Sequence, residues 1–536
     1  MLTVISIVTP SMKVRVIDTG ILTAAQNMAL DEALLRAQSE NPHAIPVIRF
    51  LRFSPPCVLV GRYQSPAQEA RLSYIRERGW HVNRRITGGG AIFFDPSQIG
   101  WEFFARFDKG FPKNPQKLYE MISACGVAGL RKLGVHAQFR PRNDIEVDGR
   151  KISGTGGASD EHAFMFQGTL LVKNVAEDML KALRVPAEKL GRHGLESIKE
   201  RVVFLEELLS PLPEPEVLKN ALLTGFTEVL GIEPIPSQLT DREREIYNEL
   251  IKFFSSDEWI YKIDNPSSRK GTLTGVSRAD GVVRAAAHVE VDKKLVTSVQ
   301  FWGDFFVTPK RIIPDLEASL KFIPANPKKA REKVDEFFVK NKFDFIGVSP
   351  KNFADALSMA IEKIELVRRG LTFEETNNIM FANIDLRRIE EYDFEYFLFP
   401  YCSKLVGCAW RHDVNCPMCG QCSVGEGYEI ALASGLKPMT ITSFEHLVQT
   451  HRWLRKKGVK GYIGSCCEEF FVKHKDEFDG SGLNIILVRI DSATCYELSQ
   501  AKAAYRGEFE SQTELNLKLI RKTLGLIRPR KSIKAE

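Results

Sequence analysis

The sequence lacks the features that would place the protein in a membrane or on nucleic acid. No stretch of its 536 residues reaches the roughly 18 uninterrupted apolar residues that a membrane-spanning helix needs. Its first 14 residues do not resemble a signal peptide, because no basic region precedes an apolar run. The net charge of +6 is small for this length, and Lys and Arg alternate with acids, which argues against a nucleic-acid-binding surface. We therefore expect a cytoplasmic protein that binds neither membranes nor nucleic acids.

Cysteine is nearly absent from most of the chain. Only Cys57 and Cys125 fall in the first 400 residues, whereas the other eight of the ten cysteines lie between positions 402 and 495. A cytoplasmic protein forms few disulfides, so this cluster is more typical of metal binding or thiol chemistry than of a disulfide framework. Internal repeats and low-complexity segments are also absent, and the apolar content of 44% is that of a folded globular protein.

The pattern of apolar residues predicts an α+β protein with three domains, in keeping with its length. In the first domain, 12–250, strand-like runs alternate with helices, and an amphipathic helix follows Asn27. Residues 174–250 have a mostly helical pattern. The strand-like runs of this domain are 46–53, 58–60, 91–94 and 165–172.

Two further domains are predicted to follow. The second, 255–370, is a small α+β domain, and the third, 371–536, is an α/β domain that holds the clustered cysteines. The second domain has strand-like segments around Ala279-Asp280-Gly281 and at 289–291 and 295–302, and helical stretches at 328–340 and 352–368. The third has a βαβ-like pattern made of strand 439–442, helix 444–457 and strand 459–463.

A triplet of glycines, Gly88-Gly89-Gly90, is the first candidate for a binding site. Without Cβ atoms, the backbone N–H groups of such a turn can converge on an oxygen anion. A tight loop without a ligand would also explain an isolated triplet. Here Arg84 and Arg85 lie just upstream, and a strand-like run that ends before Asp95 follows. Because the planar guanidinium group donates paired hydrogen bonds to phosphate, this context favours a phosphate site.

A second segment, 143–151, adds acidic groups and one lysine. Asp148-Gly149 joins the strand-like arms 145–147 and 150–153, and Asp-Gly at that position predicts a hairpin with a type I′ turn. On this hairpin Lys151 can direct a fixed charge into a pocket, although most lysines lie on the surface. Asn143-Asp144 can orient ATP phosphates through Mg²⁺ or simply begin a turn. Together, the two segments suit acyl-adenylate chemistry.

In their order and spacing these segments resemble the lipoate–protein ligases, within the larger family of biotin and lipoate ligases. The resemblance implies a mixed sheet with helices like that of the biotin and lipoate ligases. The part 255–345, with Glu258-Trp259 and Gly303-Asp304-Phe305-Phe306, resembles the accessory domain of two-domain ligases. The matching segments are 26–31, 61–64, 84–85, 88–93, Asp95, 143–144, 149–154, 168–171 and 197–202.

The resemblance implies an ATP-dependent reaction in two steps. Lipoate and ATP, with Mg²⁺, form lipoyl-adenylate, and a lysine of an acceptor domain then attacks the activated carbonyl. The implied acceptors are lipoyl domains of 2-oxoacid dehydrogenases or the glycine cleavage H protein. Lys151 would be catalytic, contacting the lipoyl carbonyl and the phosphate, and Gly88 and Gly89 would shape the lipoyl tunnel. The implied substrate- and ATP-binding residues are Arg85, Gly88, Gly89, Gly90, Ala91, Ile92, Phe93, Asn143 and Asp144.

Two departures from the family pattern leave the acyl group, lipoate or octanoate, open. Many relatives have histidine where this chain has Phe94 and Gln167.

A related group transfers octanoyl or lipoyl groups without ATP, through a cysteine that lies shortly before the equivalent of Asn143. The stretch 135–144 contains no cysteine, which favours the ATP-dependent ligase. An ATP-independent acyltransferase and a non-catalytic lipoate carrier are the alternatives, and we expect Cys125 to be a buried core thiol.

The clustered cysteines predict a metal centre in the third domain. Cys416-x2-Cys419-x2-Cys422 has the close spacing of iron–sulfur and zinc sites. A simple ferredoxin site is disfavoured because Glu426 stands where that pattern has its fourth cysteine. We predict an iron–sulfur cluster or zinc held by three of these cysteines and a distant one, with free or regulatory thiols as the alternative. The candidate ligands are Cys402, Cys408, Cys416, Cys419, Cys422, Cys466, Cys467 and Cys495. The segment resembles a cysteine-rich domain family with no assigned activity.

Overall fold

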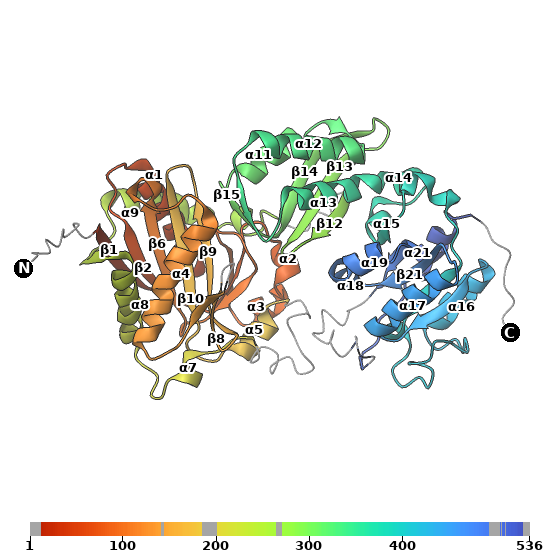
Figure 1. Cartoon of the computed structure of the whole chain (residues 1–536), viewed down its shortest axis with the longest axis horizontal. Helices are drawn as coiled ribbons and strands as arrows, with labels where there is room; N and C mark the ends of the chain where they lie inside the picture. The colour runs from red at the N-terminus through yellow and green to blue at the C-terminus, as the bar shows by residue number, and fades with distance from the viewer. Residues whose placement is uncertain are drawn as a thin grey trace, which may run out of the picture.

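The computed structural model describes residues 12–140, 144–184, 201–263, 271–491, 504, 506, 508–509 and 511–528. Its elements form an amino-terminal unit (12–263), a middle unit (271–371) and a carboxy-terminal unit (372–528). The three units follow one another along the long axis of the molecule (Figure 1). Among the described residues, no helix combines the length and apolar character that crossing a membrane would require.

The amino-terminal unit is built on a mixed sheet of eight strands in the order β11-β1-β2-β6-β10-β9-β8-β7. Strands β11, β1 and β2 are parallel to one another, and the remaining neighbours are antiparallel. The strands are β1 (Met12–Leu22), β2 (Val47–Phe53), β6 (Ile99–Arg106), β7 (Gln138–Arg140), β8 (Asp144–Val147), β9 (Arg150–Ser159), β10 (Ala163–Leu170) and β11 (Ile232–Pro236).

Helices cover both faces of this sheet. On one face α4 (Pro115–Lys132) and α8 (Pro215–Leu230) bury a core with Trp101 and Phe226. The two helices cross closely, because a Cβ at Gly225 would lie only 2.2 Å from the Cys125 carbonyl oxygen. Cys125 is fully buried there, which confirms the predicted core thiol. On the other face lie α1 (Ala24–Glu40), capped by Thr23, and α9 (Asp241–Phe254).

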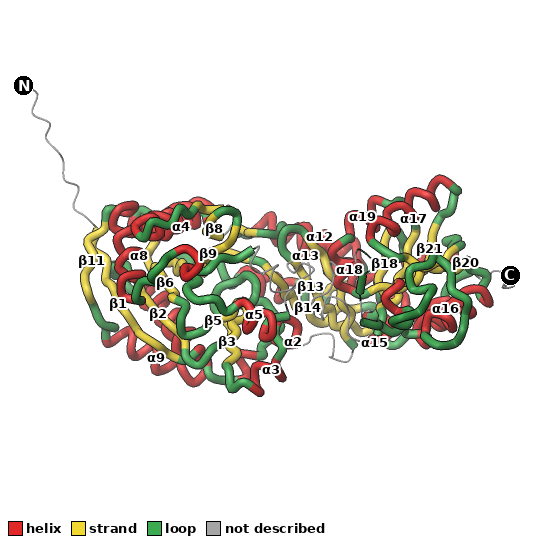
Figure 2. The backbone as a smooth tube through the Cα atoms, turned by 90° about the horizontal axis from the view of Figure 1, so that it is seen from below, coloured by secondary structure: helices red, strands yellow, loops and turns green. Residues whose placement is uncertain are grey.

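A small second sheet of this unit carries the glycine triplet. Its order is β4-β3-β5, and Gly88-Gly89-Gly90 lies in the connection from β4 to β5. The strands are β3 (Cys57–Val60), β4 (His81–Arg84) and β5 (Ile92–Phe94). Figure 2 shows α2, α3 and α5 beside this sheet. The short helices of the unit are α2 (Pro66–Glu69), α3 (Leu72–Glu77), α5 (Ala176–Ala182), α7 (Leu205–Leu208) and α10 (Asp257–Ile260).

The middle unit has an antiparallel sheet, β12-β13-β14-β16, covered by helices, and a two-stranded sheet, β15-β17. Its strands are β12 (Thr272–Arg278), β13 (Val282–Glu290), β14 (Leu295–Asp304), β15 (Phe306–Thr308), β16 (Ile323–Pro324) and β17 (Asp344–Ile346). Its helices are α11 (Ile312–Ser319), α12 (Pro327–Lys340), α13 (Pro350–Glu362) and α14 (Ile364–Arg368).

The carboxy-terminal unit has a five-stranded sheet in the order β18-β22-β21-β19-β20, in which all strands but β18 are parallel. The predicted βαβ pattern is present, but β19 lies between its two strands. The strands are β18 (Ile379–Ala382), β19 (Tyr396–Pro400), β20 (Lys437–Ile441), β21 (Gly461–Cys466) and β22 (Asn484–Arg489). The helices are α15 (Phe373–Asn377), α16 (Ser423–Ala433), α17 (Phe444–Lys456), α18 (Glu468–Lys473), α19 (Lys475–Gly480) and α21 (Leu517–Leu524).

The predicted α+β fold class is confirmed. The three domains with boundaries 12–250, 255–370 and 371–536 stay a prediction. Each of these ranges contains one of the three largest sheets.

Candidate active site

Lys151 lies in β9, on the predicted hairpin that β8 and β9 form. Asp148 and Gly149 have φ angles of 50° and 76°, as the two central residues of a type I′ turn require. The Lys151 N–H donates to the Arg201 carbonyl at 2.6 Å, and its carbonyl accepts from the Val203 N–H at 2.9 Å. The hairpin prediction is therefore confirmed, and the segment 201–203 fixes the backbone of Lys151 from the other side.

The Lys151 side chain depends on the absence of a side chain at Gly154. A Cβ at position 154 would lie 2.7 Å from Nζ and 2.8 Å from Cε of Lys151, closer than atoms can pack. The glycine leaves the space in which Nζ approaches Asp144 Oδ1, at 2.6 Å. The Lys151 and Asp144 side chains are about one third exposed, 33% and 28%, so the pair is open to a ligand.

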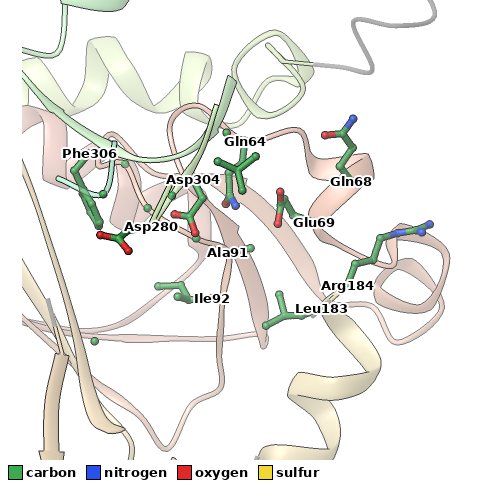
Figure 3. Close-up of a pocket in the computed structure, with 18 of the residues that line it drawn as sticks. Gln64, Gln68, Glu69, Ala91, Ile92, Leu183, Arg184, Asp280, Asp304 and Phe306 are labelled. Atoms are coloured by element: carbon green, nitrogen blue, oxygen red, sulfur yellow. The ribbon is translucent and has the colours of Figure 1, made fainter. Parts of the chain in front are cut away.

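One large cleft of about 1550 Å³ brings the two predicted segments together. The middle and carboxy-terminal units also line it, for example with Asp304 and Glu468. Figure 3 shows Asp304 close to Ala91, with Asp280 and Phe306 to one side. Asn143 lies outside the described residues. All the other predicted catalytic and substrate-binding residues line the cleft, namely Arg85, Gly88, Gly89, Gly90, Ala91, Ile92, Phe93, Asp144 and Lys151.

Arg85 holds the glycine loop in shape. Its guanidinium group donates to the carbonyl of Leu59 at 2.6 Å, and to those of Gly88 and Gly90 at 3.2 and 2.8 Å. Burial lowers the pKa of Arg85 to about 10, and Asp304 opposes that shift. These hydrogen bonds place Arg85 behind the loop, where it positions the loop, and its predicted contact with the nucleotide stays a prediction.

The turn from β14 to β15 covers the glycine loop. The Gly89 N–H donates to the Phe305 carbonyl at 3.2 Å. A Cβ at Gly88 would lie 2.3 Å from that oxygen, and one at Gly89 would lie 2.5 Å from Phe306 Cζ. Gly89 also has a φ of 86°, which favours glycine. The glycine triplet therefore also allows close packing between the amino-terminal and middle units, which no local pattern in the sequence indicates.

No cysteine is among the described residues that line the cleft. Cys57 and Cys125 are both fully buried. Burial raises the pKa of the Cys125 thiol to about 12, and it raises that of Cys57 further. A thiol nucleophile must be deprotonated and accessible. Neither thiol meets these conditions, and the chain has no other cysteine before position 402.

A buried ion network joins α1 to the eight-stranded sheet, and no local pattern in the sequence indicates it. Arg49 on β2 contacts Asp31 of α1 at 2.7 Å and Glu102 of β6 at 3.0 Å, and all three side chains are at most 2% exposed. Burial raises the pKa of Asp31 to about 6, and that of Glu102 well above its usual value, although Arg49 opposes both shifts. Arg49 also donates a hydrogen bond to Asn27 Oδ1, so Asn27 and Asp31, one turn apart on α1, belong to the same buried network.

On the far side of the cleft, α18 is joined to the middle unit by an ion pair. Arg284 on β13 contacts Glu468 at 3.1 Å. Burial alone would raise the pKa of Glu468, but Arg284, Arg489 and Lys363 together hold it below its usual value. Both residues of this ion pair line the cleft, so the pair forms part of one wall.

The described cysteines do not form the predicted metal centre. No group of three or more His, Cys, Asp or Glu in the described part of the chain is placed to hold a metal ion, and Cys495 lies outside that part. The loop that carries these cysteines is organised by Lys404, whose Nζ donates to the carbonyls of Trp410, Asp413 and Asn415 at 2.7, 2.9 and 2.7 Å. Cys402, Cys416 and Cys422 pack against the hydrophobic core instead. The iron–sulfur or zinc prediction is unsupported.

Known proteins resemble the part of the chain that carries the glycine loop and Lys151. Residues 23–227 match the family model described as the lipoyl protein ligase A/B catalytic domain. A protein named "Probable lipoate-protein ligase A", from Mycoplasma pneumoniae, is 30% identical over 292 residues, which cover 54% of this chain and 83% of that relative. The chain belongs to the lipoyl protein ligase A/B family.

The relatives of this chain include both ligases and acyltransferases. The octanoyltransferase LipM of Kyrpidia tusciae is 29% identical over 270 residues, which cover 46% of this chain and 98% of that relative. A solved bipartite lipoate protein ligase from Thermoplasma acidophilum is 26% identical, with 47% of this chain and 96% of that chain covered and a TM-score of 0.42. By its family and its curated relatives, the chain is an enzyme of the group that attaches lipoyl or octanoyl groups to proteins. Sequence identity does not separate ligase from transferase, because ligases and transferases are similar to it in almost the same degree.

Proposed function

We propose that the protein is an ATP-dependent lipoate–protein ligase, which forms lipoyl-adenylate and transfers the lipoyl group to a lysine of an acceptor domain. The observation that carries this proposal is that none of the described residues lining the cleft is a cysteine. An acyltransferase that works through a cysteine thioester needs a nucleophile beside the acyl group. Cys57 and Cys125 are buried away from the cleft, so a route that activates the acyl group with ATP suits these residues better.

Lys151 supplies charge stabilisation in both steps. In the first, the lipoate carboxylate attacks the α-phosphorus of ATP and pyrophosphate leaves. In the second, the acceptor amine attacks the carbonyl carbon of the adenylate and AMP leaves, giving an amide. Negative charge grows on phosphate oxygens in the first step and on the carbonyl oxygen in the second. An ammonium group held in place at these oxygens lowers both barriers, and the loss of one such contact typically costs about 10²–10³ in rate.

The residues around Lys151 divide the remaining tasks. Asp144 orients the Lys151 ammonium, and its carboxylate is of the oxygen-donor type that Mg²⁺ prefers, so it would hold the metal that accompanies ATP. The glycine loop, with Ala91, Ile92 and Phe93, lines the side of the cleft assigned to the nucleotide and the adenylate. Arg85 keeps that loop in shape through its backbone carbonyls.

The proposed substrates are lipoate or octanoate together with ATP. The proposed acceptors are lipoyl domains of 2-oxoacid dehydrogenases or the glycine cleavage H protein. The middle unit, which closes over the glycine loop, takes the part of the ligase accessory domain.

Lipoylation of an acceptor lipoyl domain with and without ATP tests this proposal. We expect an acceptor mass increase only with ATP and lipoate, together with pyrophosphate release. Lys151→Ala should lose the ATP-dependent modification. Lys132→Ala is its matched control, because Lys132 also has an acidic partner, Glu228, but lies on α4 outside the cleft. Transfer from an octanoyl-carrier protein without ATP, at a rate equal to that with ATP, would overturn the ligase assignment in favour of the transferase.

A further inference from the structure

The carboxy-terminal unit contains a second cavity, for which the proposed ligase chemistry has no use. The parallel strands of this unit have the spatial order β20-β19-β21-β22. The next strand along the chain, β20, therefore pairs with one edge of β19, and the strand after it, β21, pairs with the opposite edge. In open parallel sheets, ligands bind outside the carboxyl ends of the two strands where the order reverses. Here these strands are β19 and β21.

The cavity lies at that point of the sheet. It has a volume of about 100 Å³ and is lined by Pro400, Tyr401 and Cys402 at the end of β19, and by Ser465, Cys466 and Cys467 at the end of β21. A single water needs only roughly 10–15 Å³ of such space. The cavity can therefore receive several non-hydrogen atoms of an organic ligand.

Its lining selects an uncharged, apolar ligand. None of the described residues that line it is Asp, Glu, Lys, Arg or His, and rings such as Phe399 and Phe470 form much of the wall. An ionised phosphate or carboxylate buried here would lack a counter-charge, at a large cost in free energy. Among the polar side-chain atoms of the described residues that line the cavity, one is buried without a hydrogen-bond partner. The Ser465 side chain is 6% exposed, and its Oγ is buried without a hydrogen-bond partner.

Sulfur atoms form one side of the cavity. Burial raises the pKa of the Cys466 thiol well above its usual value, and the nearby Cys402 adds to the shift. Thr513 donates a hydrogen bond to the Cys402 sulfur at 3.3 Å. These thiols are therefore neutral, polarisable groups suited to contact with other sulfur atoms.

A single helix separates this cavity from the cleft. In α18, Glu468, Glu469 and Val472 line the cleft, whereas Phe470, on the same helix, and Cys467, just before it, line the cavity. A group that leaves the cleft needs to move past only one helix to reach the cavity.

We propose that the cavity binds the apolar end of a lipoyl group, with its dithiolane sulfurs against Cys402 and Cys466 and the Ser465 hydroxyl as a hydrogen-bond donor. This rests on the proposed function, in which the cleft produces the lipoyl group as an uncharged amide. The amide form suits a cavity without charged residues, and the dithiolane is the part of the ligand that matches the thiol wall. Binding breaks and forms no covalent bond.

Protection of cysteines from alkylation tests the proposal in the full chain. Cys466 is partly exposed, so a small maleimide reaches it, although slowly because little of the thiol is ionised. Cys466 and the exposed Cys419 are therefore alkylated with N-ethylmaleimide at pH 8.5 over a time course long enough to modify Cys466 in the free protein, with lipoamide as the probe, and the rates are read from peptide masses. We expect lipoamide to slow alkylation of Cys466 by about fivefold or more and to leave Cys419 unchanged. Octanamide, which lacks the sulfurs, should protect less. Ser465→Ala removes one hydrogen bond with little change in volume, and should weaken lipoamide binding about three- to tenfold.

Several results would overturn the proposal. These are no protection of Cys466, equal protection of Cys419, or octanamide protection equal to that of lipoamide. A mixed disulfide with lipoamide found only on Cys402 or Cys466 would also support it. Such a side product forms when the cysteine sulfur bonds to one dithiolane sulfur, the S–S bond of the ring breaks and the other sulfur leaves as a thiol, so it requires lipoamide in the cavity. Because no described cysteine lines the cleft, lipoamide bound there does not mimic this result. Adenylate formation, measured on the same preparation, reports separately on the proposed ligase function.

Discussion

Gly154→Ala should disable the enzyme without unfolding it, because the new methyl group would fall on the end of the Lys151 side chain. A Cβ at position 154 would lie 2.7 Å from Nζ, whereas packed atoms lie about 3.5–4.0 Å apart. The ammonium group must therefore move by about 1 Å, and a displacement of that size can cost about 10²-fold in rate. The moving group is the flexible end of a partly exposed side chain, so the melting temperature should stay nearly constant.

The assay is ATP–pyrophosphate exchange driven by lipoate, read beside thermal unfolding. Gly100→Ala is the matched control. Its Cβ would lie 2.8 Å from Leu51 Cδ2 in the buried sheet, away from the cleft. Such overpacking typically costs about 1–3 kcal/mol of stability, so this variant should melt earlier and keep its exchange rate per folded molecule. If Gly154→Ala exchanged within about threefold of the parent rate, less than 1 kcal/mol in barrier, the proposed role of the Lys151 position would be refuted.

Other variants probe further parts of the argument. Lys151→Ala should abolish lipoyl-adenylate formation, and near-normal pyrophosphate exchange in that variant would remove Lys151 from the mechanism. Burial raises the pKa of Asp31 from 3.8 to about 6, so its contribution to stability is complete below about pH 4 and is lost as the pH rises past about 6. The free energy of unfolding of the parent should therefore fall between pH 4 and pH 7.5, and Asp31→Asn should make that fall smaller by up to about 3 kcal/mol. Urea titrations at several pH values measure it. A pH dependence of stability equal to that of the parent would contradict the assignment. Lys404→Met removes the ammonium that holds three carbonyls of the 410–415 loop and should speed proteolysis there, whereas Lys437→Met, at an exposed lysine of the same unit, should not.

Local signals in the sequence were sufficient to predict the hairpin of the candidate site. Asp-Gly at 148–149 predicted the hairpin because few dipeptides accept positive φ at both positions. The glycine triplet and Lys151 were then found on one cleft. These features depend on a few neighbouring residues, so they can be read without knowledge of the tertiary structure.

Contacts between distant segments could not be predicted in this way. The packing of Phe305 and Phe306 on the glycine loop joins residues more than two hundred positions apart, and no local pattern announces it. The same holds for the Arg49 network. The βαβ-like pattern at 439–463 was recognised, but sequence periodicity does not give the spatial order of strands, so the insertion of β19 was missed. Cysteine spacing alone suggested a metal centre, whereas Lys404 organises that loop.

The hydrogen bond from Gly89 to the Phe305 carbonyl also bears on which ligands the loop can accept. Its donor is already satisfied by a neutral oxygen, so a ligand at this N–H exchanges one hydrogen bond for another. Hydrogen bonds to ionised acceptors are about twice as strong as those between neutral groups. A phosphate oxygen can therefore displace the carbonyl, while water or a neutral oxygen gains nothing. The Phe305 carbonyl thus competes with ligands for the Gly89 N–H. An anionic oxygen can replace it, so the covering turn favours anionic over neutral ligands at the loop.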